Sequence, residues 1–346
     1  MRNFLRRAAT ILIVLPVFAL LLLAADNRIV PPPRPPEDAP HAIVGLGDST
    51  MSGEGAGNYT PDTDGAKNDW CHRSPQAMVQ HIKLTTATKI FNFACSGADA
   101  QAIRLTGPHP VEPSQAAQLA AIASTYRIDA VVVAVGANDD PQFGGLLSNC
   151  IDAIFTAAKP GCGKQVDPQW QKRVDAMVPK VVAALRDVRH IMIEHGYPDS
   201  AYQLVLQSYA APVAPDVLRS LQNVGGCPLR TDDLRWVQDR GVPVLNDGIR
   251  RAAEQGGARF LDLSRAGIGH EACTGGQEWF TRLTVNLADF QDKNRYPHAL
   301  QQSFHPNAAG YTAFAHCMSQ FLTLTQRQAA CVPDGHGSVQ LALPST

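Results

Sequence analysis

The sequence has few charged residues and almost no net charge. Of its 346 residues 18% are charged, and 30 Lys and Arg nearly cancel 31 Asp and Glu, which leaves a net charge of −1 and an isoelectric point near 6.8. No basic stripe stands out along the chain. Proteins that bind nucleic acid usually carry such a stripe or a strong excess of positive charge. The composition therefore gives no support for a nucleic acid partner.

Three glycine-rich motifs are absent from the turn that follows the apolar run 42–47. A dinucleotide-binding turn would need glycine in place of Thr50, and a phosphate-binding loop would need a lysine. The nucleophile elbow of α/β-hydrolases would need glycine in place of Met51. What remains is Ser49 on a turn directly after a buried strand, which is a suitable place for a nucleophile.

The N-terminus combines positive charge with a long apolar run. Three arginines precede residues 8–25, a run of 18 residues without charge: Arg2, Arg6 and Arg7. As a helix this run would be roughly 27 Å long, close to the hydrocarbon thickness of a bilayer. We therefore predict that residues 1–25 are either a signal peptide or a membrane anchor, and that the rest of the chain is exported to the cell envelope or beyond. The imperfect cleavage site Leu23-Ala24-Ala25 favours the anchor.

The remaining chain divides into three parts. Residues 26–40 are rich in proline and are expected to form a stiff linker. Residues 41–333 are expected to form one folded domain, since α/β domains reach about 300 residues. Residues 334–346 contain Pro, Gly and Ser and are expected to be a flexible tail. We expect a monomer.

None of the eight cysteines belongs to a C-x-x-C pair, so a zinc ribbon or a dithiol redox site is not expected. An even number of cysteines in an exported chain indicates disulfides. About 105 pairings are possible. We predict pairing between neighbours, because it closes four modest loops that each stabilise the fold by roughly 2–4 kcal/mol: Cys71–Cys95, Cys150–Cys162, Cys227–Cys273 and Cys317–Cys331. Metal binding is the weaker alternative.

Short β-rich apolar runs alternate with helical patterns from residue 41 onward. Strands are predicted at 42–47, 89–94, 130–135, 203–208 and 259–263. Helices are predicted at 75–83, 113–124, 168–195, 232–254 and from about 307. This alternation predicts an α/β fold with a parallel sheet and helices on both faces. Residues 141–166 and 266–302 break the alternation and are expected to be loops that shape access to the site.

Four short motifs follow one another in a characteristic order. They are Gly47-Asp48-Ser49, Asn92-Phe93-Ala94-Cys95-Ser96-Gly97, Gly136-Ala137-Asn138-Asp139 and Ser303-Phe304-His305-Pro306-Asn307. Together they resemble the four blocks of the SGNH (GDSL-type) hydrolase family. The resemblance covers most of residues 42–322 and implies a three-layer α/β/α sandwich, flavodoxin-like, with a mainly five-stranded parallel sheet.

The resemblance implies a role for one residue of each motif. Ser49 is the expected nucleophile and His305 the expected general base. The expected oxyanion donors are the N–H groups of Ser49 and Gly97 and the side-chain amide of Asn138. These groups meet the needs of ester hydrolysis, which are an activated hydroxyl, a base that titrates near neutrality and donors for the oxyanion. The implied activity is carboxylic ester hydrolysis through an acyl-enzyme, with a small or lipid ester as substrate and no metal or organic cofactor.

Three further segments are similar to the secreted actinobacterial esterases and lipases within this family. They are Ser52-Gly53-Glu54-Gly55, Cys71-His72-Arg73-Ser74-Pro75 and His270-Glu271-Ala272-Cys273. In those enzymes a cysteine pair resembling Cys71 and Cys95 is bridged near the site.

The sequence departs from the family at residue 302. Most members place an aspartate three residues before the histidine, and this chain has Gln302. Because some members of the subgroup use a backbone carbonyl there, we predict that the Gln302 carbonyl accepts a hydrogen bond from His305 Nδ1–H. Ser49 and His305 would then form a dyad.

Other interpretations of the same residues stay open. Ser49 alone could be only a helix N-cap, and Asn138 only a turn former. The missing aspartate would also suit a catalytically silent protein that binds glycans or lipids in the envelope. A sugar-ester O-acetylesterase or an acyltransferase could use the same residues.

Overall fold

The computed structural model describes residues 34–87, 89–106, 111–155, 160–286, 295 and 298–344. Residues 1–33 lie outside this part of the chain. They include the expected signal peptide or anchor, with the possible membrane tether at residues 8–25, and the first part of the linker. Among the helices of the described part, none combines the length and the apolar character needed to cross a membrane.

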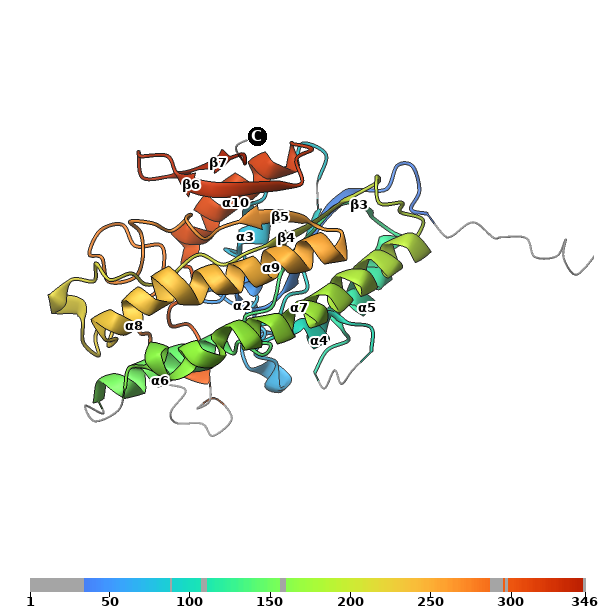
Figure 1. Cartoon of the computed structure of the whole chain (residues 1–346). Coiled ribbons are helices and arrows are strands. Elements are labelled where there is room, and N and C mark those ends of the chain that lie inside the picture. Colours follow the sequence, from blue (N-terminus) through green and yellow to red (C-terminus); the bar gives the residue numbers. More distant parts are fainter. Residues whose placement is uncertain are drawn as a thin grey trace, which may run out of the picture. The chain divides into compact units, whose positions relative to one another are not determined.

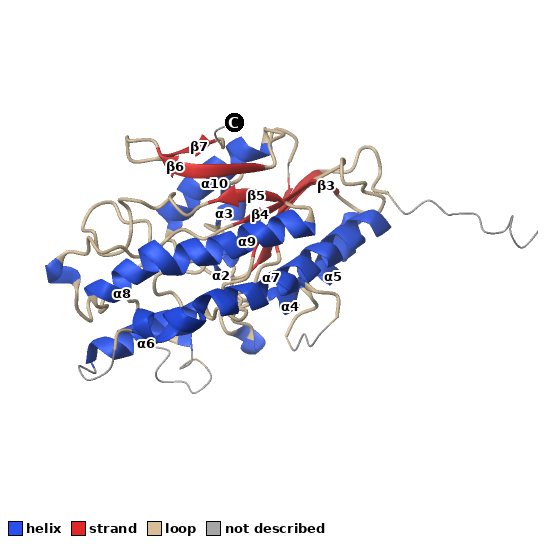
Figure 2. Ribbon diagram, in the orientation of Figure 1, coloured by secondary structure: helices blue, strands red, loops and turns tan. Residues whose placement is uncertain are grey.

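The described residues form a seven-stranded sheet with the strand order β2-β1-β3-β4-β5-β6-β7. Figure 2 shows the strands in red and the helices in blue. Strands β1 to β6 are parallel, and β7 pairs antiparallel with β6. The strands are β1 (His41–Gly47), β2 (Lys89–Asn92), β3 (Arg127–Ala134), β4 (Gln203–Gln207), β5 (Arg259–Asp262), β6 (Gln328–Pro333) and β7 (Val339–Ala342). The five strands predicted from the sequence correspond to β1–β5.

Two strands extend the sheet beyond the five that were expected. β6 is short and is tied to the last helix by the disulfide Cys317–Cys331, and β7 returns along its outer edge. The expectation of a flexible tail from residue 334 is therefore wrong for residues 339–342. The four-residue edge strand β7 carries little pattern of its own, because its pairing with β6 and not local alternation holds it in place.

Helices cover both faces of the sheet and make three layers (Figure 1). One face carries α4 (Ala100–Ile103), α5 (Gln115–Ala123), α7 (Cys162–Glu194) and α9 (Val242–Gly256). The other face carries α3 (Met78–His81) and α10 (Ala308–Leu322). The central strands are buried on both sides and consist largely of Val, Ile, Leu and Ala, as parallel sheets require. The predicted α/β/α sandwich is confirmed.

The smaller elements lie in the connections. They are α2 (Ser49–Ser52), α6 (Phe143–Phe155), α8 (Thr231–Trp236), the 3₁₀ turns η1 (Ala66–Asn68) and η2 (Arg219–Leu221), and a π-helical turn η3 (Val237–Gly241) that joins α8 to α9.

The segment 141–166 was expected to be a loop, and most of its described part is helical. It contains α6, and α7 begins at Cys162 instead of near Pro168. Tertiary contacts hold this first part of α7 despite the proline: Gly163 N–H donates to Asp233 at 2.9 Å, and buried Trp170 donates to the Gly241 carbonyl at 3.0 Å. A proline inside a helix costs about 3 kcal/mol, which contacts of this kind can offset.

The eight cysteines form four disulfides, and the pairing is the one between neighbours. Cys150–Cys162 ties α6 to the start of α7, and Cys71–Cys95 ties the loop before α3 to the end of β2. Both bridges therefore hold connections that leave or approach the carboxyl ends of the strands, where the candidate residues lie.

Candidate active site

The turn that carries Ser49 depends on glycine at position 47. Gly47 ends β1 with φ +133°, and a Cβ there would lie 1.9 Å from the Ala134 carbonyl oxygen of β3. Gln115 fixes the same residue from α5: its Oε1 accepts the Gly47 N–H at 2.6 Å and its Nε2 donates to the Gly47 carbonyl at 2.8 Å. The strand therefore stops abruptly, and Ser49 becomes the first residue of α2.

Asp48 has a structural role in this turn. It caps α2 by accepting from Thr50 N–H at 3.0 Å and from the Thr50 hydroxyl at 2.7 Å. The Tyr209 hydroxyl donates to its other oxygen at 2.5 Å and joins the turn to the end of β4. Complete burial raises the pKa of Asp48 to about 6, against the lowering effect of these hydrogen bonds.

Ser49 and His305 meet at hydrogen-bond distance although 256 residues separate them. His305 Nε2 lies 2.8 Å from Ser49 Oγ. His305 precedes α10, and Phe304 before it has φ +61°, a left-handed conformation that is uncommon for a non-glycine residue. This turn directs the imidazole toward α2. In this geometry neutral His305, with its proton on Nδ1, can accept the Ser49 proton at Nε2.

The carbonyl of Ser303 lies 3.2 Å from His305 Nδ1, and the backbone of Gln301 also hydrogen-bonds to this ring; both contacts raise the pKa of His305. The prediction for Gln302 is therefore wrong, because the residues on either side of it contact the ring instead. The Gln302 carbonyl instead accepts from the Thr281 hydroxyl at 2.6 Å. The reason is local: the left-handed turn at Phe304 brings the chain back on itself, so the carbonyl of Ser303 faces the ring. Among the described residues no carboxylate hydrogen-bonds to His305.

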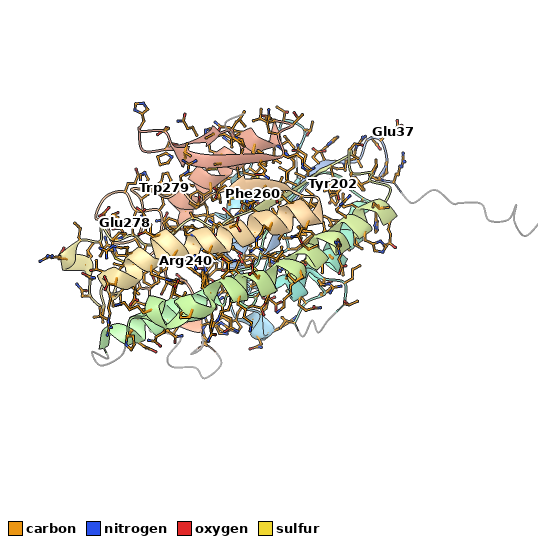
Figure 3. All side chains as sticks on the ribbon, viewed as in Figure 1. Glu37, Tyr202, Arg240, Phe260, Glu278 and Trp279 are labelled. Carbon is orange, nitrogen blue, oxygen red and sulfur yellow. A yellow bond between two sulfur atoms is a disulfide. The ribbon has the colours of Figure 1, made fainter. Side chains whose placement is uncertain are left out.

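The His305 loop is held by the segment around Trp279, which was expected to be part of a loop near the site. Figure 3 labels Glu278 and Trp279 in this segment. Thr281 N–H donates to the His305 carbonyl at 2.9 Å, and Asn307 N–H donates to the Trp279 carbonyl at 2.8 Å. Asn307 also caps α10 through its side chain. Backbone hydrogen bonds on both sides of His305 therefore fix the position of the ring.

The two other motifs bring hydrogen-bond donors to the same place. Gly97 follows β2 with φ +81°, and Asn138 follows β3. Asn138 Nδ2 donates one hydrogen to the Ala98 carbonyl at 3.0 Å, which leaves its second N–H for a ligand. Asp139 accepts from Ala100 N–H at 3.0 Å and joins the same two loops, and burial raises its pKa to about 7. The two loops are thus tied to each other on either side of the candidate oxyanion donors.

All four motif residues, Ser49, Gly97, Asn138 and His305, line one cavity of about 390 Å³. Its walls are mostly apolar and come from several elements. The apolar lining residues include Phe143, Leu147 and Ile151 of α6, Val242 and Leu245 of α9, and Leu263, Phe280, Phe304 and Phe314. Part of this wall is α6, the helix that was not expected from the sequence.

A buried carboxylate lies behind His305. Glu54 is fully buried and accepts hydrogen bonds from His72 Nδ1 at 2.8 Å, from the Ser96 hydroxyl at 2.7 Å and from the Tyr59 hydroxyl at 2.9 Å. Burial alone would raise the pKa of Glu54, but the hydrogen bond and charge of His72 outweigh it and lower this pKa. The next residue, Gly55, packs on His305 so closely that a Cβ there would lie 2.9 Å from His305 Cβ.

Two opposing effects act on the His305 ring. Burial lowers the pKa of His305 below its ordinary value of 6.5, because the imidazolium loses its hydration. The negative charge of Glu54 raises this pKa and is the largest of the opposing effects. From the sequence, Glu54 was identified only as part of a motif. Its effect on the pKa of His305 could not be predicted, because it depends on partners from three separate segments.

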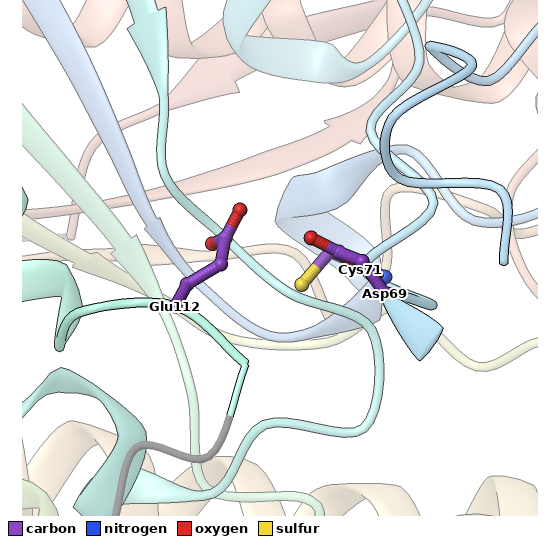
Figure 4. Close-up of side chains that lie close together, drawn as sticks. All are labelled: Asp69, Cys71 and Glu112. Atoms are coloured by element: carbon purple, nitrogen blue, oxygen red, sulfur yellow. Dashed lines mark hydrogen bonds between the residues drawn. The ribbon is translucent and has the colours of Figure 1, made fainter. Parts of the chain in front are cut away.

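A second cluster of acidic groups lies near Cys71 (Figure 4). Ligand atoms of Asp69, Cys71 and Glu112 lie within 4.8 Å of one another. The Cys71 sulfur is bonded to Cys95, and Glu112 forms a two-point ion pair with Arg73. Burial and the nearby Glu112 raise the pKa of Asp69. These partners account for the cluster as a structural support for the loop before α3.

Comparison with known proteins gives the family. Residues 46–313 match the GDSL-like Lipase/Acylhydrolase family, and the chain belongs to this family. It is similar to Lipase 2 of Streptomyces coelicolor, with 28% identity over 277 residues, 77% of this chain and 81% of that protein. The family makes the protein a carboxylic ester hydrolase and confirms the resemblance that its motifs indicate.

Two solved structures from Streptomyces share the fold. They are phospholipase A1 from Streptomyces albidoflavus NA297, with a TM-score of 0.55, and an extracellular lipase from Streptomyces rimosus, with a TM-score of 0.50. Each is 20% identical to this chain, and each match covers 79% of this chain and 95% of the other.

Replacement of Asn138 by alanine is expected to lower kcat by about 100- to 1000-fold, the usual cost of losing one oxyanion donor. KM should change little, because the donor acts mainly on the charge that forms in the transition state. Steady-state kinetics on a soluble ester measure both constants. Ser148→Ala, at the exposed rim of the same cavity, is the control and should stay near wild type. An Asn138→Ala variant with wild-type kcat would rule out the role.

Replacement of Glu54 by glutamine removes the charge that stabilises the His305 imidazolium. With His305 as the expected general base, only its neutral form would be active, so kcat/KM should rise with pH through the pKa of this residue. In Glu54→Gln the midpoint of that rise should move down by about one pH unit, and kcat should fall because the imidazolium formed during attack is less stable. Asp187→Asn, a remote carboxylate paired with Arg104, should leave the profile unchanged. An unmoved midpoint in folded Glu54→Gln would contradict the account.

Proposed function

We propose that this ester hydrolase acts through an acyl-enzyme on Ser49, with His305 as general base. The 2.8 Å contact between Ser49 Oγ and His305 Nε2 carries this proposal. His305 removes the hydroxyl proton as Ser49 Oγ bonds to the ester carbonyl carbon. The oxyanion then accepts hydrogen bonds from the N–H groups of Ser49 and Gly97 and from the Asn138 amide.

The same histidine completes both halves of the reaction. The imidazolium returns its proton to the leaving alcohol as the carbon–oxygen bond breaks, and the acyl group remains on Ser49. Neutral His305 then removes a proton from a water molecule that attacks the acyl carbon. Collapse of the second oxyanion releases the carboxylic acid, and His305 gives the proton back to Ser49 Oγ.

In this mechanism the His305 ring is oriented without a carboxylate hydrogen-bonded to its Nδ1. The Ser303 carbonyl accepts the Nδ1–H, which selects the tautomer with a free lone pair on Nε2. Glu54 supplies negative charge from behind the ring. We therefore propose a Ser–His dyad with an indirect electrostatic partner, and no metal or organic cofactor enters any step.

The substrate is proposed to be an ester with an apolar acyl chain. The cavity beside Ser49 has room for several methylene groups and has aromatic and aliphatic walls. The four disulfides and the apolar N-terminal run support export, with residues 1–25 as signal peptide or anchor and the catalytic domain acting as a monomer outside the cytoplasm. The similar Streptomyces proteins, which are lipases and a phospholipase A1, support this choice.

A series of p-nitrophenyl esters from acetate to palmitate tests the proposed function. Wild-type protein should hydrolyse them with a preference for chains that fill the cavity, and Ser49→Ala should lose at least about 1000-fold in kcat. Thermal unfolding of both proteins checks that the substitution leaves the fold intact. Equal rates for wild type and Ser49→Ala on every ester would contradict the proposal.

A further inference from the structure

One polar side chain that lines the cavity, that of Gln207, takes no part in the proposed mechanism. Gln207 is the last residue of β4, two strands from the strand that carries Ser49. It is only 3% exposed, and it lines the cavity that Ser49 and His305 also line. Gln207 belongs to none of the four family motifs, and it is not one of the residues that hold the His305 loop.

Gln207 differs from its polar neighbours because its carbonyl oxygen has no partner. Oε1 is buried and forms no hydrogen bond with the part of the chain that the structure describes. The neighbouring Ser208 hydroxyl donates to Asp262 at 2.9 Å, and the Tyr209 hydroxyl donates to Asp48 at 2.5 Å. A buried carbonyl oxygen without a partner is unfavourable, and few are found in native proteins. This one borders a space that a ligand can enter.

The surroundings define the kind of group that would satisfy this amide. A side-chain amide both donates and accepts, so a hydroxyl is a matched partner. No Lys or Arg is found among the described residues that line the cavity, so an anionic substituent would lack a counter-charge. Both oxygens of Asp48, the one carboxylate among the described residues that line the cavity, already accept hydrogen bonds from Thr50 and Tyr209, so a cationic substituent would have to compete with these donors.

In the proposed reaction the acyl half of the ester is the part that can remain in the cavity that Gln207 lines. The leaving alcohol must lie next to His305 Nε2 and then depart, whereas the acyl chain stays bonded to Ser49 Oγ and occupies the apolar cavity. We propose, on the basis of the function proposed above, that Gln207 binds a hydroxyl group on the acyl chain, so that the preferred substrates are esters of hydroxylated fatty acids.

Matched esters test this inference. The probes are p-nitrophenyl octanoate and its positional isomers that carry one hydroxyl at carbons 3 to 8. Wild type should hydrolyse at least one hydroxylated isomer with a kcat/KM roughly 10- to 100-fold above that of the unsubstituted ester, because only this isomer pairs with the buried amide. In Gln207→Met, which has a similar volume, the preference should disappear or reverse.

Leu245→Met is the matched control, since it alters the apolar wall of the same cavity without changing its hydrogen-bonding groups. It should keep the wild-type ratio between hydroxylated and plain esters. A wild type that hydrolyses no hydroxylated isomer faster than the plain ester, or a Gln207→Met variant that keeps the wild-type preference, would overturn the inference. Hydrolysis of plain octanoate by wild type and its loss in Ser49→Ala would still stand, so failure here is distinct from failure of the proposed function.

Discussion

The contact between Ser49 Oγ and His305 Nε2 is the interaction on which the site depends, and both ends of it are set by backbone constraints. On one side, Gly47 stops β1 within a single residue because only glycine fits against the Ala134 carbonyl. On the other, backbone hydrogen bonds to the His305 and Trp279 carbonyls hold the turn before α10. Ser49 and His305 come from opposite ends of the domain, and these backbone contacts hold Ser49 Oγ and His305 Nε2 2.8 Å apart.

The charge around His305 is arranged differently from a triad with an aspartate. Burial disfavours the imidazolium, and no described carboxylate touches Nδ1 to compensate. The compensation comes from Glu54, which is kept ionised by His72 and held by Ser96 and Tyr59. The charge of Glu54 raises the pKa of His305 without a direct hydrogen bond, whereas the Ser303 carbonyl orients the ring by accepting from Nδ1. Orientation and charge, which an aspartate supplies together, are divided here between two groups.

Much of the fold and three of the four motif residues could be predicted because each of the three follows a predicted strand, whereas His305, which precedes α10, was predicted from the family resemblance. The three are Ser49, Gly97 and Asn138, and the predicted strands are β1–β5. The remaining features depend on distant contacts. Pro168 indicated a helix start, but packing of Trp170 extends α7 beyond it. Whether the Gln302 or the Ser303 carbonyl faces the ring depends on the torsion at Phe304, and the missing partner of Gln207 depends on the shape of the cavity.

Covalent labelling tests whether Ser49 is an activated nucleophile. A fluorophosphonate reacts with a serine only where a neighbouring base activates the hydroxyl and donors stabilise the anionic phosphoryl oxygen. Intact mass followed by peptide mapping of the oxidised, folded protein should show one adduct, located on Ser49, and none on Ser49→Ala. Folded wild-type protein that stays unlabelled, or an adduct on another residue, would contradict the account.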